Sequence, residues 1–141
     1  QREPLSEADQ DAYFRDVVAP QFDQPEPAQV LVAVELDGRL IGYGGIVHLA
    51  WGDRRGEVSF LTDTSRTDPA TFRDDWRAYL AMLVPAARVM GLHKLTTEAY
   101  AFRTDLFGLL VEHGFVLEGT LREQHAHEDG WVDSLVHGLL L

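Results

Sequence analysis

The chain has no cysteine among its 141 residues. It can therefore form neither a disulfide, nor a thiolate nucleophile, nor a zinc site of the cysteine type. This absence is typical of proteins from a reducing compartment, and we expect a cytoplasmic protein. Long apolar runs are also missing: none approaches the roughly 20 residues that a membrane-spanning helix needs, so we expect no membrane partner.

Basic residues are scarce. The sequence has 12 Lys and Arg against 23 Asp and Glu, which gives a formal net charge of -11. Affinity for nucleic acid comes largely from Lys and Arg that displace counterions from phosphates, so we expect no nucleic-acid partner. A cationic amine is a more natural ligand for such a chain. Six arginines gather in one span, where we expect any anionic ligand to bind: Arg54, Arg55, Arg66, Arg73, Arg77 and Arg88.

The composition that remains is that of one globular domain. The chain is 45% hydrophobic and 25% charged, which is enough apolar material to bury a core over this length. No internal repeat or low-complexity tract divides it. We therefore predict a single domain that covers residues 1–141.

The first half of the chain predicts a helix followed by a meander of three antiparallel strands. Ser6 is an N-cap for a helix that we expect to end before Pro20. Asp37 and Gly38 form a two-residue hairpin signal between strands expected at residues 30–36 and 40–49. A third strand is expected at residues 57–63.

The second half predicts a long helix, a strand, a short helix and two final strands. Asp68 and Pro69 cap the long helix, and Pro85 inside it should kink it or remove one backbone hydrogen bond. A strand is expected at residues 94–100 and a helix at about 104–113, closed by Gly114. We expect a bulge at the Glu118-Gly119 pair, and a turn at residues 125–130 to join the last two strands.

Two groups of residues in this order of elements resemble a known family. Near the C-terminus they are Gly114, Phe115, Glu118, Gly119, Leu121, Arg122, Gly130, Trp131 and Asp133, and before the short helix they are Thr97, Glu98, Tyr100, Phe102 and Arg103. They resemble the GNAT superfamily of acyl-CoA N-acyltransferases. The pattern is most similar to the ribosomal-protein alanine and spermidine N-acetyltransferase branch, and to GNAT modules fused to ATP-grasp-type enzymes.

The resemblance implies an α+β fold with a mixed, mostly antiparallel sheet, flanked by helices and splayed between the fourth and fifth family strands. It implies acetyl-CoA as co-substrate, and an acetyl transfer by direct attack to a primary amine of a small molecule such as an amino sugar, amino acid or polyamine. The alternative is a non-catalytic GNAT-fold interaction or regulatory module with weak or no CoA binding. Because the usual N-terminal strand is not evident, we expect either its absence or a chain cut from a longer one, with a fused domain or a homodimer as partner.

The resemblance also implies where acetyl-CoA binds. In the family, the strand before the long helix holds the pantetheine arm and the helix N-terminus holds the pyrophosphate. This chain departs from the family's glycine-containing loop, since no glycine occurs between Gly56 and Gly91, and side-chain charge is expected to replace backbone contacts. The residues expected to contact the cofactor are Phe60, Leu61, Thr62, Arg66, Ala70, Thr71, Phe72, Arg73 and Arg103.

The expected catalytic residues are Glu98, Glu57 and Tyr100. Either carboxylate could accept the amine proton directly or through water, and either could instead be a solvated or cross-strand-paired surface group. Tyr100 could protonate the leaving thiolate, because Leu110 occupies the helix position where many family members have a tyrosine.

His48 and Trp51 are the expected acceptor contacts, unless they only pack a loop. Two further patterns favour structural interpretations. The loop residues His125, His127, Glu128 and Asp129 could ligate zinc or nickel, but a solvated turn explains them better, and we expect no metal. The glycines between positions 42 and 45 lie in a strand and precede no helix, so they predict close backbone approach or a bulge rather than a phosphate loop.

Overall fold

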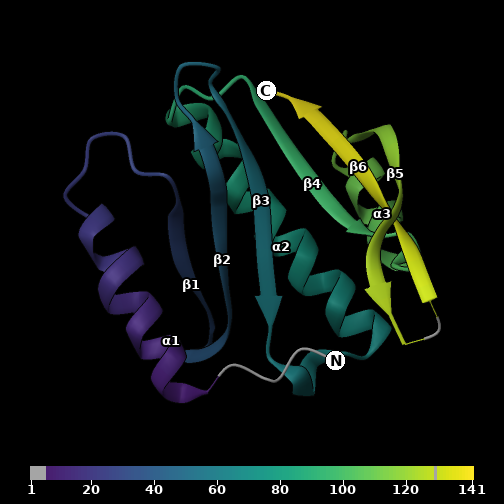
Figure 1. Ribbon diagram of the computed structural model, residues 1–141, viewed down its shortest axis with the longest axis horizontal. Helices are drawn as coiled ribbons and strands as arrows, with labels where there is room; N and C mark the ends of the chain where they lie inside the picture. Colours follow the sequence, from purple (N-terminus) through teal and green to yellow (C-terminus); the bar gives the residue numbers. More distant parts are fainter. Residues whose placement is uncertain (1–5, 129) are drawn as a thin grey trace.

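A computed structural model describes residues 6–128 and 130–141. The described residues form one six-stranded sheet in the order β1-β2-β3-β4-β6-β5, in which only the β3–β4 pair is parallel. The predicted α+β fold with a mixed, mostly antiparallel sheet is confirmed (Figure 1). The strands are β1 (Val30–Leu36), β2 (Arg39–Ala50), β3 (Arg55–Thr62), β4 (Lys94–Tyr100), β5 (Val116–His127) and β6 (Gly130–Leu140).

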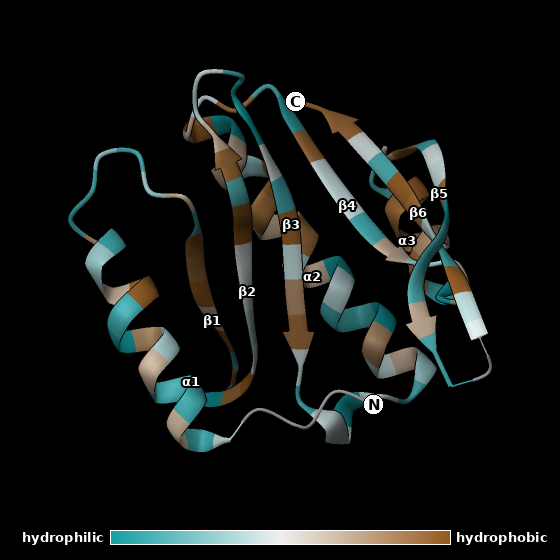
Figure 2. Cartoon of the chain, viewed as in Figure 1, coloured by the Kyte–Doolittle hydropathy of each residue, from teal (hydrophilic) through white to brown (hydrophobic). Residues whose placement is uncertain are grey.

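Helices α2 (Pro69–Val89) and α3 (Thr104–Glu112) pack on the same face of the sheet and bury one continuous core. Apolar residues alternate along the strands and follow one side of α2, and Figure 2 shows these hydrophobic segments where the sheet meets the helix. The fully buried members include Ile46, Tyr79, Leu80, Leu95, Leu109, Leu110 and Phe115. Within the described residues, no helix has the length and apolar character that crossing a bilayer demands.

The N-terminal helical segment runs further than its sequence predicts. Ser6 forms a capping box with Asp9 at the start of α1 (Glu7–Tyr13), and a π-helical turn (Phe14–Val18) and a 3-10 turn (Ala19–Gln21) then follow. The expected end before Pro20 is wrong, because proline in the first turn of a helical segment lacks only an N–H that has no intrahelical partner. The edge of the Phe14 ring meets Tyr43, with 6.3 Å between the ring centroids.

Helix α2 begins where its cap predicts and continues through Pro85. The Asp68 carboxylate accepts a hydrogen bond from the Thr71 N–H at 3.0 Å, and Pro69 occupies the first turn. Tyr79, at the middle of the helix, donates its hydroxyl to the Ser59 carbonyl of β3 at 2.6 Å. This bond joins the long helix to the third strand.

The final hairpin is longer than expected, and its turn is shorter. His125 pairs with Val132 and His127 pairs with Gly130, so the predicted turn at residues 125–130 is wrong and His125 lies in β5. Backbone pairing satisfies these groups more fully than a loop does, and the polar side chains remain exposed at the strand end. The predicted bulge at Glu118 and Gly119 is confirmed by a register shift there.

A second register shift in β5, between Leu121 and His125, was not expected. The Asp133 carboxylate accepts a hydrogen bond from the Glu123 N–H at 2.8 Å within this bulge. The bulge therefore changes the direction in which the following residues, Gln124 and His125, present their side chains.

The sheet is divided at the β3–β4 pair. Only three residue pairs join these strands, Arg55↔Lys94, Gly56↔Leu95 and Glu57↔Thr96, whereas β4 and β6 share seven. Beyond Glu57 and Thr96 the two strands separate, as Figure 1 shows. The splay implied by the family resemblance is therefore present, between the structure's third and fourth strands.

The glycines of β2 allow close approach of neighbouring backbone, as predicted. Gly45 has φ of +145°, and a Cβ placed on it would collide with the Val30 carbonyl of β1. A Cβ on Gly44 would meet the Ser59 carbonyl and the Tyr79 hydroxyl. Larger residues at these two positions would force β2 away from its neighbours.

We predict that Gly45→Ala lowers the free energy of unfolding by about 1–3 kcal/mol, because it adds backbone strain and overlap with β1. Gly52→Ala is the matched control, since a Cβ at Gly52 meets no atom within 4 Å. Chemical denaturation of both variants measures the difference. Equal stability of the two would show that β1 and β2 adapt without cost.

Candidate functional site

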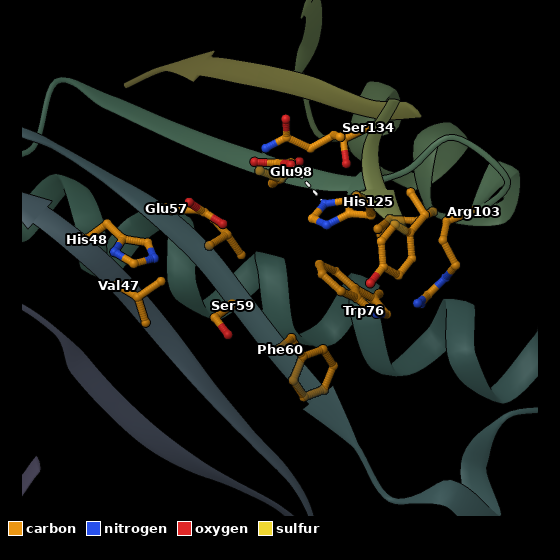
Figure 3. A pocket seen from close by; sticks show the side chains of 16 residues that line it. Val47, His48, Glu57, Ser59, Phe60, Trp76, Glu98, Arg103, His125 and Ser134 are labelled. Atoms are coloured by element: carbon orange, nitrogen blue, oxygen red, sulfur yellow. Dashed lines mark hydrogen bonds and ion pairs between the residues drawn. The ribbon is translucent and has the colours of Figure 1, made fainter. Parts of the chain in front are cut away.

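A cavity lies where β3 and β4 separate. Its volume is about 500 Å³, and Figure 3 shows its walls from close by. Because side chains alternate along a strand, the cavity receives groups from both faces of the sheet through the gap. Its lining residues are Val47, His48, Glu57, Val58, Ser59, Phe60, Trp76, Thr97, Glu98, Ala99, Tyr100, Arg103, Leu106, Gln124, His125 and Ser134.

The three predicted catalytic residues all line this cavity. Glu57 and Glu98 alternate with core residues of β3 and β4, so both carboxylates lie on the face opposite α2. Burial raises the pKa of Glu57 above its ordinary value, His48 lowers this pKa, and the negative charge of Glu98 raises it again. Glu57 is half-buried, and its carboxylate makes no hydrogen bond or ion pair with the described residues, so it is available to a ligand.

His48 reaches the cavity through an irregularity in β2. The register between β2 and β3 shifts between Val47 and Ala50, and His48 has a positive φ of 50°. A non-glycine residue in this conformation is uncommon and marks positions where surrounding structure fixes a side-chain direction. The other expected acceptor contact, Trp51, does not line the cavity; its indole N–H donates to the Pro27 carbonyl at 2.8 Å and holds the preceding connector.

A cluster of three side chains forms the opposite wall. His125 Nε2 lies 3.3 Å from Glu98 Oε1, and the Tyr100 ring meets the His125 ring edge to face with 4.8 Å between centroids. The sequence alone assigned His125 to a turn and missed it as a cavity residue. The unexpected bulge before it has no clear sequence signature, although the alternation of His125 and His127 is compatible with a strand.

Buried polar atoms add to the hydrogen-bonding capacity of the cavity wall. The Trp76 indole N–H and the hydroxyls of Thr97 and Ser134 have no hydrogen-bond partner among the described residues, and all three residues line the cavity. Burial of such groups without a partner costs about 1–3 kcal/mol each. This cost is offset when a polar ligand bonds to them, so the cavity suits a ligand with several polar groups.

A second cavity, of about 400 Å³, lies beside the start of α2. Phe60 and Arg103 line both cavities and so form a boundary between them. The Arg103 guanidinium lies over the Phe72 ring, 5.4 Å from its centroid. The lining residues are Phe60, Leu61, Thr62, Thr67, Pro69, Phe72, Phe102, Arg103, Thr104 and Asp105.

The structure divides the expected cofactor contacts into two groups. Phe60, Leu61, Thr62, Phe72 and Arg103 line the second cavity, whereas Arg66, Ala70, Thr71 and Arg73 do not. These last four residues lie at and just before the first turns of α2 and do not line the second cavity.

Three of the residues outside the second cavity have protein partners of their own. Arg66 makes two hydrogen bonds, of 2.7 and 2.8 Å, to the Asp75 carboxylate, which is only 8% exposed. The Thr71 N–H is bonded to the Asp68 cap, and Arg73 Nε donates to the Pro69 carbonyl at 3.3 Å. Asp75 therefore neutralises Arg66, and the Arg66 guanidinium is committed to a protein partner.

The two cavities differ in charge. Glu57 and Glu98 make the first anionic on the face opposite α2, and Arg103 brings a cation to the boundary with the second. Between them, strand pairing ends and the facing backbone edges of β3 and β4 are open to an extended ligand that carries amide groups. The first cavity can hold a cationic group beside Glu57 and Glu98, and Arg103 at the boundary can contact an anionic group, with the Asp105 carboxylate also in the lining of the second cavity.

Within residues 6–128 and 130–141, no group of three or more metal-ligating side chains comes together. The metal-binding pattern considered for the last hairpin included Asp129, which lies outside the described residues. His125, from the same pattern, faces Glu98 in the cavity.

Comparisons with known proteins agree with this architecture. Among solved structures, the spermidine/spermine N-acetyltransferase SpeG from Vibrio cholerae is similar with a TM-score of 0.81 and 18% identity, over 96% of this chain and 74% of that one. A complex of Vibrio cholerae spermidine N-acetyltransferase with CoA and spermine gives 0.80 and 18%, over 99% and 78%. Ribosomal-protein-alanine N-acetyltransferase from Brucella melitensis gives 0.67 and 23%, over 80% and 69%. No curated protein sequence matches the chain.

A family model assigns the chain. The model for the acetyltransferase (GNAT) domain matches residues 3–136, which is nearly the whole sequence. These residues include both strands that separate, the helix start beside the second cavity, and all three expected catalytic side chains. The chain therefore belongs to the GNAT family, as an acetyl-CoA-dependent N-acetyltransferase.

Proposed function

We propose that the chain transfers the acetyl group of acetyl-CoA to a primary amine of a small molecule, such as an amino sugar, an amino acid or a polyamine. The observation that carries this proposal is the cavity at the β3–β4 separation, which Glu57 and Glu98 line on the face of the sheet opposite α2. Two carboxylates attract a protonated amine and stabilise its positive charge.

The reaction proceeds by direct attack in this proposal. The neutral amine nitrogen attacks the thioester carbonyl, a C–N bond forms, the C–S bond breaks, and the amine loses a proton while the thiolate gains one. No residue of the chain needs to carry the acetyl group. Tyr100, which lines the cavity, is the acid that we propose for the thiolate, whereas Leu110 is buried in the core and offers no acid from α3.

Two further facts support a small cationic acceptor. The chain carries a net charge of -11, which favours cations over polyanions. A solved relative from Vibrio cholerae with the same fold contains CoA and spermine, a small amine. In the present chain His48 on β2 and His125 on β5 line the cavity from its two sides, as Figure 3 shows, and we take them as contacts for a compact acceptor rather than a protein tail.

We predict that the chain releases CoA faster with small amines than with a peptide that begins with alanine. Initial rates with glucosamine, a panel of amino acids, spermidine and such a peptide measure this preference at a fixed acetyl-CoA concentration. A clear preference for the peptide would overturn the assignment of a small-molecule acceptor. Absence of CoA release with every amine would overturn the proposed function itself.

Arg103 and Arg66 should differ in role, the first in acetyl-CoA binding and the second in the stability of the fold. We predict that Arg103→Ala weakens acetyl-CoA binding roughly 10- to 100-fold, because a charge-assisted hydrogen bond contributes about 1.5–3 kcal/mol. Arg66→Ala should instead lower the thermal midpoint and leave acetyl-CoA affinity unchanged, since its guanidinium is bonded to Asp75. Calorimetric titration and thermal unfolding of both variants test the pair. The opposite pattern would place the phosphate site at Arg66.

Replacement of Glu57 should lower the activity and raise the stability of the protein. We predict that Glu57→Gln lowers kcat/KM for a cationic amine roughly 10- to 100-fold, through loss of a charge-assisted contact. The same variant should be more stable than wild type at neutral pH. Burial raises the Glu57 pKa in the folded state above 4.5, so its ionisation costs stability as pH rises through and above that value.

Thermal unfolding across pH checks the second part of this prediction. The stability difference between Glu57→Gln and wild type should shrink below pH 4.5, where the carboxyl is protonated in both folded and unfolded states. A difference that does not vary with pH would show that charge burial at Glu57 is not its source.

A further inference from the structure

The side chain of His125 is held in a fixed relation to Glu98 at the cavity wall. The two groups are 3.3 Å apart, from Nε2 to Oε1, and His125 is 39% exposed. An ionised carboxylate can only accept a hydrogen bond. The contact therefore places the proton of a neutral His125 ring on Nε2 and leaves the lone pair on Nδ1.

The lone pair of Nδ1 is available to a ligand. No hydrogen bond to His125 Nδ1 occurs within the described residues, and His125 lines the cavity. Tyr100 meets the ring edge to face at 4.8 Å, which restricts its rotation from a second side. A carboxylate, an imidazole and an open ring nitrogen in this order are the arrangement by which many enzymes orient a histidine as a base.

The position of His125 is supported by its own strand. The bulge between Leu121 and His125 turns the chain, and the Asp133 carboxylate fixes this bulge through the Glu123 N–H at 2.8 Å. A solvated turn residue needs no such support. His127, two residues further along β5, lines neither cavity and instead meets the Phe102 ring, with centroids 5.7 Å apart.

We propose that His125, oriented by Glu98, is the base that accepts the proton of the acceptor amine during acetyl transfer. The proposal rests on the proposed function and deepens it by naming the base. The amine N–H bond breaks as its proton moves to Nδ1, the C–N bond forms and the C–S bond breaks. The imidazolium is stabilised by Glu98 and later releases its proton to solvent, and the CoA thiolate is protonated in turn.

This assignment gives each acidic side chain a separate role. Glu98 is a positioning residue that fixes the tautomer and stabilises the charged ring. Glu57 holds the protonated amine, which releases one proton to solvent and then attacks in its neutral form. Glu98 and Tyr100 on β4 contact the ring. The other charged and polar groups of the same cavity are Glu57 and Ser59 on β3, His48 on β2, Arg103 before α3, Gln124 on β5, and Thr97 and Ser134 on β4 and β6.

The test uses the purified full chain, acetyl-CoA and the best acceptor amine from the panel. His125→Ala should lower kcat/KM about 10²- to 10⁴-fold, which is the usual contribution of a general base. Added imidazole should restore part of this rate in proportion to its concentration, because the ring site opens to solvent. His127→Ala is the matched control on the same strand and should keep the wild-type rate.

A purely structural role for His125 predicts different results. In wild type, kcat/KM should fall toward acidic pH, because a base must be unprotonated to accept a proton, and this acidic limb should be absent in His125→Ala. Acetyl-CoA titration of the variant verifies that it is folded. If the variant is not folded, His125→Asn, which retains a planar polar side chain, replaces it in the measurement of the pH profile.

Each outcome bears on one proposal or both. Turnover of His125→Ala at the wild-type rate would overturn His125 as the base, and so would an unchanged acidic limb without rescue by imidazole. Either result would leave the acetyltransferase assignment intact. Failure of the wild-type chain to acetylate any amine would overturn the proposed function, and the role of His125 with it. Loss of rate, loss of the acidic limb and rescue by imidazole together would establish the base.

Discussion

The functional architecture depends on the limited pairing between β3 and β4. Three residue pairs join them, and each strand is then held by its own half of the structure. The antiparallel ladder with β2 and the aromatic cluster beneath it fix β3, where Phe60 stacks on Tyr79 with 4.1 Å between ring centroids. Seven pairs with β6 fix β4. Because both halves are well anchored, the gap is a stable feature that can accept an extended ligand.

The separated strands explain why one site can combine two kinds of chemistry. Glu57 and Glu98 face one side of the sheet, while Trp76 and Leu106 approach from the helical side. A ligand that passes through the gap meets carboxylates and imidazoles on one side and an arginine beside α2 on the other. This asymmetry is compatible with acetyl transfer from acetyl-CoA to an amine.

The start of α2 differs from a simple anion-binding helix terminus. Asp68 uses its carboxylate to bond the Thr71 amide, and Pro69 provides no N–H. Both features favour helix formation, but they remove donors that a phosphate would use. Arg103 lies over Phe72 at the boundary of both cavities, where side-chain charge can replace the lost backbone contacts. The helix cap and the ligand site are therefore served by different residues.

The sequence by itself determined the order of elements and the family. Local signals such as the Asp37-Gly38 turn, the Asp68 cap and the apolar periodicity of α2 depend on neighbouring residues, so they can be read along the chain. The resemblance then placed Glu57, Glu98 and Tyr100 near the separated strands, and the structure brings all three to one cavity. The extent of the splay and the position of Trp51 depended on contacts distant in sequence and could not be read in this way.

Only the tertiary structure decided which charges are free and which are bonded. Arg66 and Arg103 look alike in the sequence, yet Arg66 is committed to the buried Asp75 while Arg103 faces both cavities. His125 looked like a turn residue until a bulge held by Asp133 directed it toward Glu98. The physical reason is the same in both cases. The partner of each side chain comes from another element, and the local sequence pattern does not show which residues of different elements lie close together.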